Sequence, residues 1–115
     1  MSTAHLVVTV LAIVVTAAIA VADLVRAEFV LANAASVGVP ESWLLPLGLL
    51  KAAGAAGLAI GLVGVPVVGV AAAVGLTLFF VGAVVTHLRA RNYALGFPGA
   101  YLALAVASLA TGLAS

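Results

Sequence analysis

The sequence predicts an all-helical integral membrane protein, an antiparallel bundle of four transmembrane helices. Hydrophobic residues make up 67% of the 115 residues and charged residues only 6%, whereas soluble domains carry about 25% charged residues. The mean hydropathy is +1.45. A soluble chain of this length could not bury so much apolar surface, because small domains keep much of their surface in water. Most of the chain must therefore be surrounded by lipid.

Four apolar stretches are long enough to form the four helices. A helix that rises 1.5 Å per residue needs about 20 apolar residues to cross the hydrocarbon core. The stretches are residues 5–25, 43–62, 66–88 and 97–114. The first is not expected to be a cleaved signal peptide, because MSTAH carries no Lys or Arg and the apolar run is too long. We expect a single domain over residues 1–115.

The connections predict how the helices follow one another. Residues 26–42 are mixed in character and either extend the first helix or lie in the membrane interface, and Gly38 and Pro40 then interrupt the chain. Pro40 and Glu41 suit the first turn of the second helix, where proline and a carboxylate are both favoured. Only residues 63–65 join the second and third helices. These two helices must therefore be antiparallel neighbours.

The basic residues predict the orientation in the membrane. With four spans, the first and third connections share one side, and these connections carry Arg26, Arg89 and Arg91. The side that holds both termini carries no Lys or Arg. Because cytoplasmic loops are enriched in Lys and Arg, we expect both termini to be extracytoplasmic.

Small residues predict how the helices pack. Lipid supplies little hydrophobic drive between helices, so close backbone contact must contribute. The second helix carries two small-residue faces, which are Gly54, Gly57 and Gly61 on one face and Gly48, Ala52 and Ala56 on the other. The third helix carries Gly69 with Ala73 at four-residue spacing, and Gly75 with Gly82 two turns apart. We expect the first face to pack against the third helix. The other face serves either a neighbour within the bundle or a homo-oligomer.

Lys51 is the least expected residue within a span. It lies eight residues beyond Trp43, or about 12 Å along the helix. A lysine at such depth costs about 2.5–3.5 kcal/mol on insertion scales, so it should face the bundle interior and find a partner. The alternative is that its long stem carries the ammonium group back to the head groups.

Asp23 is the natural counter-ion of Lys51. Thr9, Thr16 and Asp23 are spaced by seven residues and share one face of the first helix with slight drift. That polar face is expected to point inward. A local pair between Asp23 and Arg26, at i and i+3, is the competing interpretation.

His87 ends the third helix and completes the candidate site. It could carry protons, donate a hydrogen bond to a ligand, ligate haem, or simply interact with the negative end of its helix. No metal site is expected, because the chain has no cysteine and His5 lies on the other side of the membrane. The secondary candidates for the same polar region are Arg26, Glu28, Arg89, Arg91 and Tyr101.

The order of several motifs resembles a known family. The segment SVGVPESWLLPLGLLKAAGAAGLAIGL, followed by AAAVGLTLFFVGAVVTHLRAR, is similar to the DoxX-like family of small bacterial four-helix membrane proteins. The matching positions are Gly38 and Pro40 before the second helix, Gly48, Lys51, Gly54 and Ala55 within it, and Gly82, Ala83 and His87 at the end of the third helix. The resemblance implies a multi-pass protein of the bacterial cytoplasmic membrane. It also implies a link to membrane redox systems, because some relatives are subunits of thiosulfate:quinone oxidoreductase or of complexes tied to oxidative stress.

Three functions are compatible with these residues. The first is an accessory component of a membrane redox system that interacts with a quinone or lipid and contacts redox-complex subunits. The second is a small membrane enzyme of isomerase or hydrolase type, with acid–base chemistry on a lipophilic substrate. The third is a non-catalytic scaffold that binds a partner. A net charge of +1 excludes an electrostatic footprint for nucleic acid, and the lipid bilayer is the one partner that composition requires. Quinone is the cofactor class to test.

Overall fold

The computed structural model describes residues 2–114 of the chain. These residues form five α-helices and one short 3₁₀-helix, with no strand among them. The elements are α1 (Thr3–Leu24), α2 (Glu28–Ser36), η1 (Glu41–Trp43), α3 (Leu44–Leu62), α4 (Pro66–Arg89) and α5 (Gly96–Ala114). The long helices lie within two residues of the apolar stretches predicted at 5–25, 43–62, 66–88 and 97–114.

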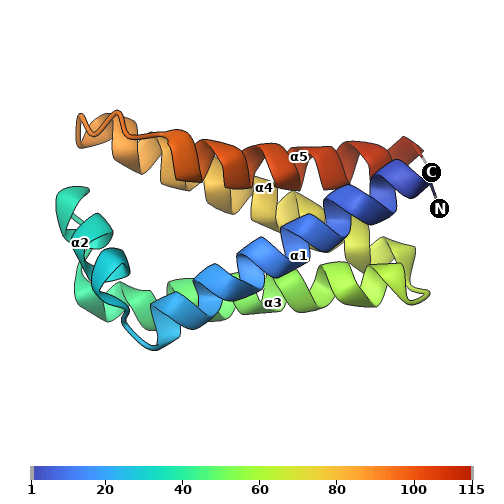
Figure 1. Cartoon of the computed structure of the whole chain (residues 1–115), viewed down its shortest axis with the longest axis horizontal. Coiled ribbons are helices and arrows are strands. Elements are labelled where there is room, and N and C mark those ends of the chain that lie inside the picture. Colours follow the sequence, from blue (N-terminus) through green and yellow to red (C-terminus); the bar gives the residue numbers. More distant parts are fainter. Residues whose placement is uncertain (1, 115) are drawn as a thin grey trace.

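The four long helices form the antiparallel bundle that the sequence predicts. They run side by side along the long axis of the molecule, with both termini at one end and α2 at the other (Figure 1). Helix α1 packs against α3 and α5, and α4 packs against the same two helices. Each span, counted from Glu41 for the one that contains α3, is long and apolar enough to cross a membrane. The expected fold class is therefore confirmed.

Helix α2 is a separate element and not an extension of α1. Arg26 adopts a left-handed conformation with φ of 53°, which is unfavourable inside a right-handed helix. The chain therefore turns after Leu24, and α2 lies across the end of the bundle (Figure 1). Pro40 then precedes the short η1 turn that leads into α3, as the Pro40–Glu41 pattern predicts.

Helices α3 and α4 approach each other backbone to backbone at their glycines. A Cβ atom added to Gly61 would lie 2.5 Å from the Cα atom of Gly69, and one added to Gly57 would lie 2.6 Å from the Cβ atom of Ala72. Any side chain at Gly61 would therefore force the two backbones apart. The predicted contact of the glycine face of α3 with α4 is confirmed. Gly75 and Gly82 were also expected in this contact, but a Cβ atom at either would meet no described atom within 4 Å.

The core of the bundle is mainly apolar, and three of its buried polar residues lie along one face of α1. Its buried apolar residues come from all four long helices and are Ala12, Leu58, Ala73, Leu76, Phe80 and Ala105. Thr9, Thr16 and Asp23 are almost completely buried, so the polar face of α1 points inward as expected. This face leads from the terminal end of the bundle to the candidate site at the opposite end.

Candidate functional site

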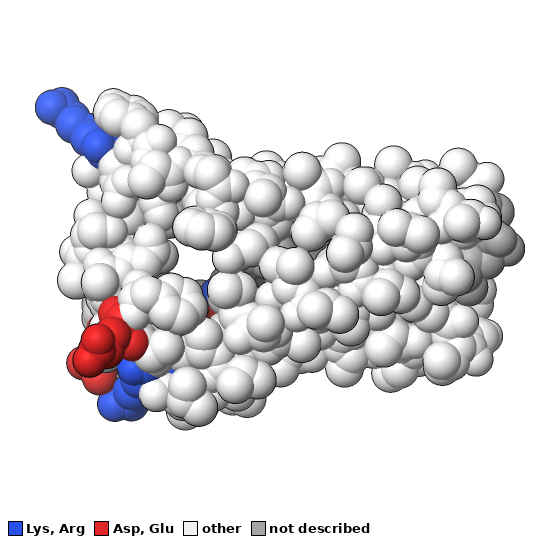
Figure 2. All heavy atoms as spheres, in the orientation of Figure 1, with Lys and Arg blue, Asp and Glu red and all other residues white. Residues whose placement is uncertain are grey.

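The formal charges lie in one half of the molecule. Figure 2 shows the acidic and basic side chains of this face gathered at the end that carries α2, while no Lys, Arg, Asp or Glu is seen at the opposite end of this face. The same picture shows a hollow toward the charged end, with a small area of acidic and basic atoms at its bottom. The charges come from the C-terminal ends of α1 and α4, the N-terminal half of α3 and the connections between them.

Asp23 and Lys51 form a buried ion pair between α1 and α3. The Lys51 Nζ atom lies 2.7 Å from Asp23 Oδ2, and the side chains are only 12% and 4% exposed, respectively. Gly48, one turn before Lys51 on α3, makes room for this approach, because a Cβ atom there would lie 3.0 Å from the Asp23 Cβ atom. Because Gly48 has no side chain, α1 can approach α3 closely enough for the Asp23 carboxylate to reach the Lys51 ammonium group.

The two competing interpretations of these residues are wrong. Arg26 pairs with Glu41 at 3.1 Å on the exposed surface, so Asp23 is left to Lys51. The Lys51 side chain turns into the bundle and not toward the head groups, since its Nζ atom also lies 5.3 Å from the centre of the Phe79 ring. An ammonium group near an aromatic face is stabilised by the negative face of the ring.

His87 is buried near the ion pair but bonds to other partners. Its Nδ1 atom lies 2.9 Å from the carbonyl oxygen of Ala83, which can only accept, so Nδ1 carries a hydrogen and donates it. Its Nε2 atom lies 3.2 Å from the side-chain amide of Asn33 on α2. Rotation of that amide presents either an oxygen or an N–H group. The contact can therefore persist whether the imidazole ring is neutral or protonated.

These groups share the wall of one pocket of about 370 Å³, which we call the Lys51 pocket. This volume lies within the range of about 300–1,000 Å³ that is typical of small-molecule sites. Its polar lining residues are Asp23, Asn33, Lys51, Thr86 and His87, and the rest of its wall is mainly aliphatic and aromatic. Helix α2 contributes part of this wall through Val30, Asn33 and Ala34, which come from its inner face.

The pocket offers hydrogen-bond donors to a ligand. An ammonium group has three N–H donors, and the hydrogen bond that Lys51 makes among residues 2–114 goes to Asp23. The Lys51 charge is balanced by Asp23, so the pocket carries no net charge from this pair. It is therefore suited to a neutral molecule with acceptor oxygens. Among the described residues, no three His, Asp or Glu side chains come together as a metal site would require.

The secondary candidates lie outside the pocket. Glu28, Arg89 and Arg91 are exposed, and Arg26 belongs to the surface pair with Glu41. Tyr101 is half-buried, with its ring centre 5.5 Å from that of Phe80 in the core. None of these five residues lines the Lys51 pocket.

Asn33 and Thr86 are the polar pocket residues that sequence reasoning missed, and Asn33 is the one that contacts His87. The signal for Asn33 lay in the spacing of Val30, Asn33, Ala34 and Val37, which is the i, i+3, i+4, i+7 pattern of one helical face. A second polar contact fixes the same region, because the side-chain amide of Asn92 donates to the Ser36 hydroxyl at 3.0 Å. Both contacts join segments more than 50 residues apart, which local patterns do not reveal.

The motifs of the second and third spans lie within a longer match to a protein family. Residues 7–108 match the DoxX-like family, which covers most of the chain. The chain belongs to the DoxX-like family. With its four apolar helices, this DoxX-like chain is a multi-pass membrane protein. No curated protein and no solved structure matches it.

Proposed function

We propose that this DoxX-like protein binds a lipophilic molecule with a neutral polar head, of the quinone class, as an accessory component of a membrane redox system. The observation that supports this proposal is the buried Lys51–Asp23 pair at the wall of a largely apolar pocket of about 370 Å³. Subunits of a redox complex are the protein partners that such a role requires.

The chemistry of the pocket suits a quinone head. Quinone carbonyl oxygens accept hydrogen bonds, and Lys51 provides donors that Asp23 leaves unused. The ring and tail would lie against the apolar wall, which includes Leu47, Leu78 and Phe79. A hydrogen bond from a charged donor contributes about 1.5–3 kcal/mol. Such a bond inside a membrane pocket would fix the orientation of the head group.

The buried pair also argues against a purely structural role. Replacing a buried ion pair by apolar residues is often neutral or stabilising, so such a pair is weak evidence for stability. A scaffold would be expected to surround its ion pair with packed side chains. Here the pair faces open space instead. The pocket thus favours ligand binding over a role in helix packing alone.

The test is to identify lipophilic molecules that remain bound through purification in mild detergent. Mass spectrometry of the extracted protein should find a quinone in about stoichiometric amount. The comparison uses the double variant Asp23→Asn/Lys51→Gln, which removes both charges and replaces the ammonium donors by a shorter, neutral amide. Loss of the quinone from this variant supports the proposal, whereas equal retention or no quinone in either protein contradicts it. Turnover of a lipophilic substrate by the purified protein without partners would instead identify the enzyme of the second hypothesis.

A further inference from the structure

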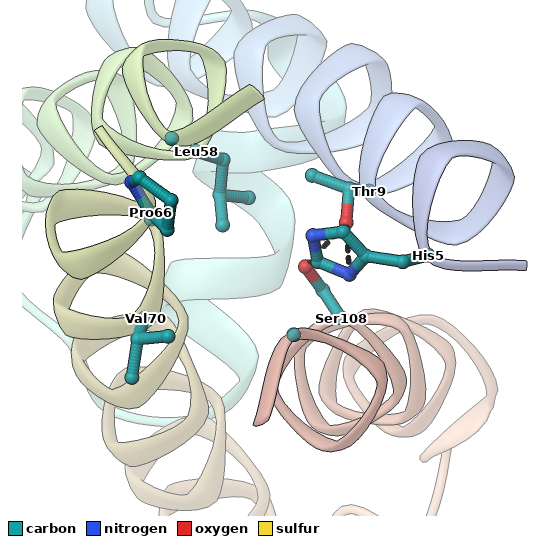
Figure 3. A pocket seen from close by; sticks show the side chains of 9 residues that line it. His5, Thr9, Leu58, Pro66, Val70 and Ser108 are labelled. Carbon is teal, nitrogen blue, oxygen red and sulfur yellow. Dashed lines mark hydrogen bonds between the residues drawn. The ribbon is translucent and has the colours of Figure 1, made fainter. Parts of the chain in front are cut away.

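A second pocket lies at the opposite end of the bundle, where both termini are found. It has a volume of about 170 Å³, and we call it the His5 pocket. All four long helices contribute to its wall, through His5, Thr9, Leu58, Gly61, Pro66, Gly69, Val70, Ser108 and Gly112. Figure 3 shows His5, Thr9 and Ser108 on one side of this space and Leu58, Pro66 and Val70 on the other. Among residues 2–114, none of the residues that line it is Lys, Arg, Asp or Glu.

Hydrogen bonds around the pocket determine which nitrogen of His5 carries a hydrogen. The Thr111 hydroxyl donates to the carbonyl oxygen of Ala107 at 2.7 Å. Its single hydrogen is thereby used, so its oxygen must accept from the Nδ1 atom of His5, which lies 2.8 Å away. The Thr9 hydroxyl lies 3.3 Å from the same Nδ1 atom and 2.7 Å from the buried Ser108 hydroxyl. In the neutral ring, Nδ1 is therefore the donor.

The other nitrogen of His5 is then a hydrogen-bond acceptor directed into the pocket. Neutral imidazole has one donor and one acceptor nitrogen, so Nε2 is the acceptor. Figure 3 shows the ring edge that carries this nitrogen turned toward Leu58, Pro66 and Val70. Within residues 2–114, no hydrogen bond is formed by Nε2. Gly112 lies against the ring, since a Cβ atom there would lie 3.2 Å from His5 Cε1.

The size and lining of the pocket indicate the class of ligand. An apolar protein cavity of about 150 Å³ is known to hold benzene, so 170 Å³ admits one small ring. One acceptor nitrogen that faces the apolar wall of Leu58, Pro66 and Val70 calls for one donor on an otherwise apolar molecule. We propose that the His5 pocket binds a small uncharged amphiphile with a single hydroxyl donor, of the phenol class, whose O–H group bonds to His5 Nε2. This site is independent of the Lys51 pocket.

The test uses the full chain in lipid nanodiscs with isotope-labelled histidine. The chain has two histidines, and His87 lies at the other pocket, so its resonance reports separately on that pocket. Phenol should shift the His5 Nε2 resonance in a saturable way, with a concentration dependence of its own. Benzene, of similar size but without a donor, should not cause the hydrogen-bond shift of the His5 Nε2 resonance. A His5 resonance that does not move with phenol, or that moves linearly together with that of His87, would overturn the proposal.

A pair of variants on α4 locates the binding. Val70→Phe places a ring inside the pocket and should abolish the saturable shift. Val67→Phe adds the same ring at a position that is 78% exposed, and should keep it. Saturation that survives Val70→Phe would show that phenol binds elsewhere and contradict the proposal. If Val70→Phe does not fold, the comparison of phenol with benzene on the unmodified chain decides the question.

Discussion

The two ends of the bundle are held together by different means. At the end that carries α2, an ion pair and side-chain hydrogen bonds connect elements around a pocket of about 370 Å³. At the terminal end, α3 and α4 approach backbone to backbone at Gly61 and Gly69, and neutral hydroxyl groups join α1 to α5. Since lipid gives helices little hydrophobic drive to associate, both ends need specific contacts. Among residues 2–114, the end that carries α2 is the one that combines a buried ion pair with the larger pocket.

This difference separates contacts for packing from contacts for binding. The contact between Gly61 and Gly69 leaves no room for a methyl group, so close packing of the two helices is enough to explain these glycines. The Lys51–Asp23 pair carries an insertion cost of about 2.5–3.5 kcal/mol for the lysine alone, and apolar residues could replace the pair without loss of stability. A costly pair beside a pocket is therefore best explained by a ligand.

The largest expected effect is on the activity of topology reporters, which is all or none. It depends on which side of the membrane each end of the bundle faces. The charged end carries Arg26, Arg89 and Arg91, so the positive-inside rule predicts that this end faces the cytoplasm. A reporter that is active only outside the cytoplasm should be active when fused after the C-terminus. The same reporter inserted between α4 and α5 should be inactive. The opposite pattern would reverse the predicted topology.

Breaking the ion pair should produce the largest loss of stability. Asp23→Ala or Lys51→Met leaves one buried charge unpaired, which costs about 3–5 kcal/mol. Thermal unfolding in detergent should show this loss for each single variant. The charge exchange Asp23→Lys/Lys51→Asp should recover part of it, because residues in contact are energetically coupled. Purely additive losses would mean that the two side chains do not interact in the membrane.

A smaller loss is expected at the terminal end. Gly61→Ala places a methyl group 2.5 Å from the Gly69 Cα atom, and overpacking of this kind costs about 1–3 kcal/mol. Gly75→Ala is the matched control, because its Cβ atom would meet no described atom within 4 Å. Alanine there should be neutral or slightly stabilising, since it favours a helix by about 1 kcal/mol over glycine. Equal melting temperatures for both variants would show that α3 and α4 do not pack at Gly61.

The smallest expected effect is at α2. His87→Phe removes the hydrogen bond to Asn33, which should cost about 0.5–1.5 kcal/mol. Because that bond and the Asn92–Ser36 bond link α2 to the end of α4 and the connection that follows it, its loss should raise amide hydrogen exchange in residues 28–36. Exchange in α3 should stay unchanged. Unaltered exchange in α2 would mean that apolar packing alone holds this helix.

The fold and the ion pair could be predicted from the sequence for physical reasons. These reasons do not apply to α2 or to the side-chain contacts between distant segments. Long apolar runs define the spans, and the cost of Lys51 in lipid requires a partner such as Asp23. The sequence alone does not show that α2 is separate from α1. Residues 26–36 have no long apolar run, and the break between the two helices depends on the left-handed conformation of Arg26. The contacts of Asn33 with His87 and of His5 with Thr111 join distant segments. No local pattern of residues specifies them.

The most direct measurement of the central claim is a quinone titration that is followed by tryptophan fluorescence. Trp43 is the single tryptophan of the chain and lines the Lys51 pocket, so a bound quinone should quench it. A short-chain quinone added to the protein in nanodiscs should quench this fluorescence in a saturable way. Affinity should fall about tenfold or more in the Asp23→Asn/Lys51→Gln variant, which corresponds to about 1.4 kcal/mol or more. Linear quenching that is the same in both proteins would contradict the claim that this pocket binds a quinone.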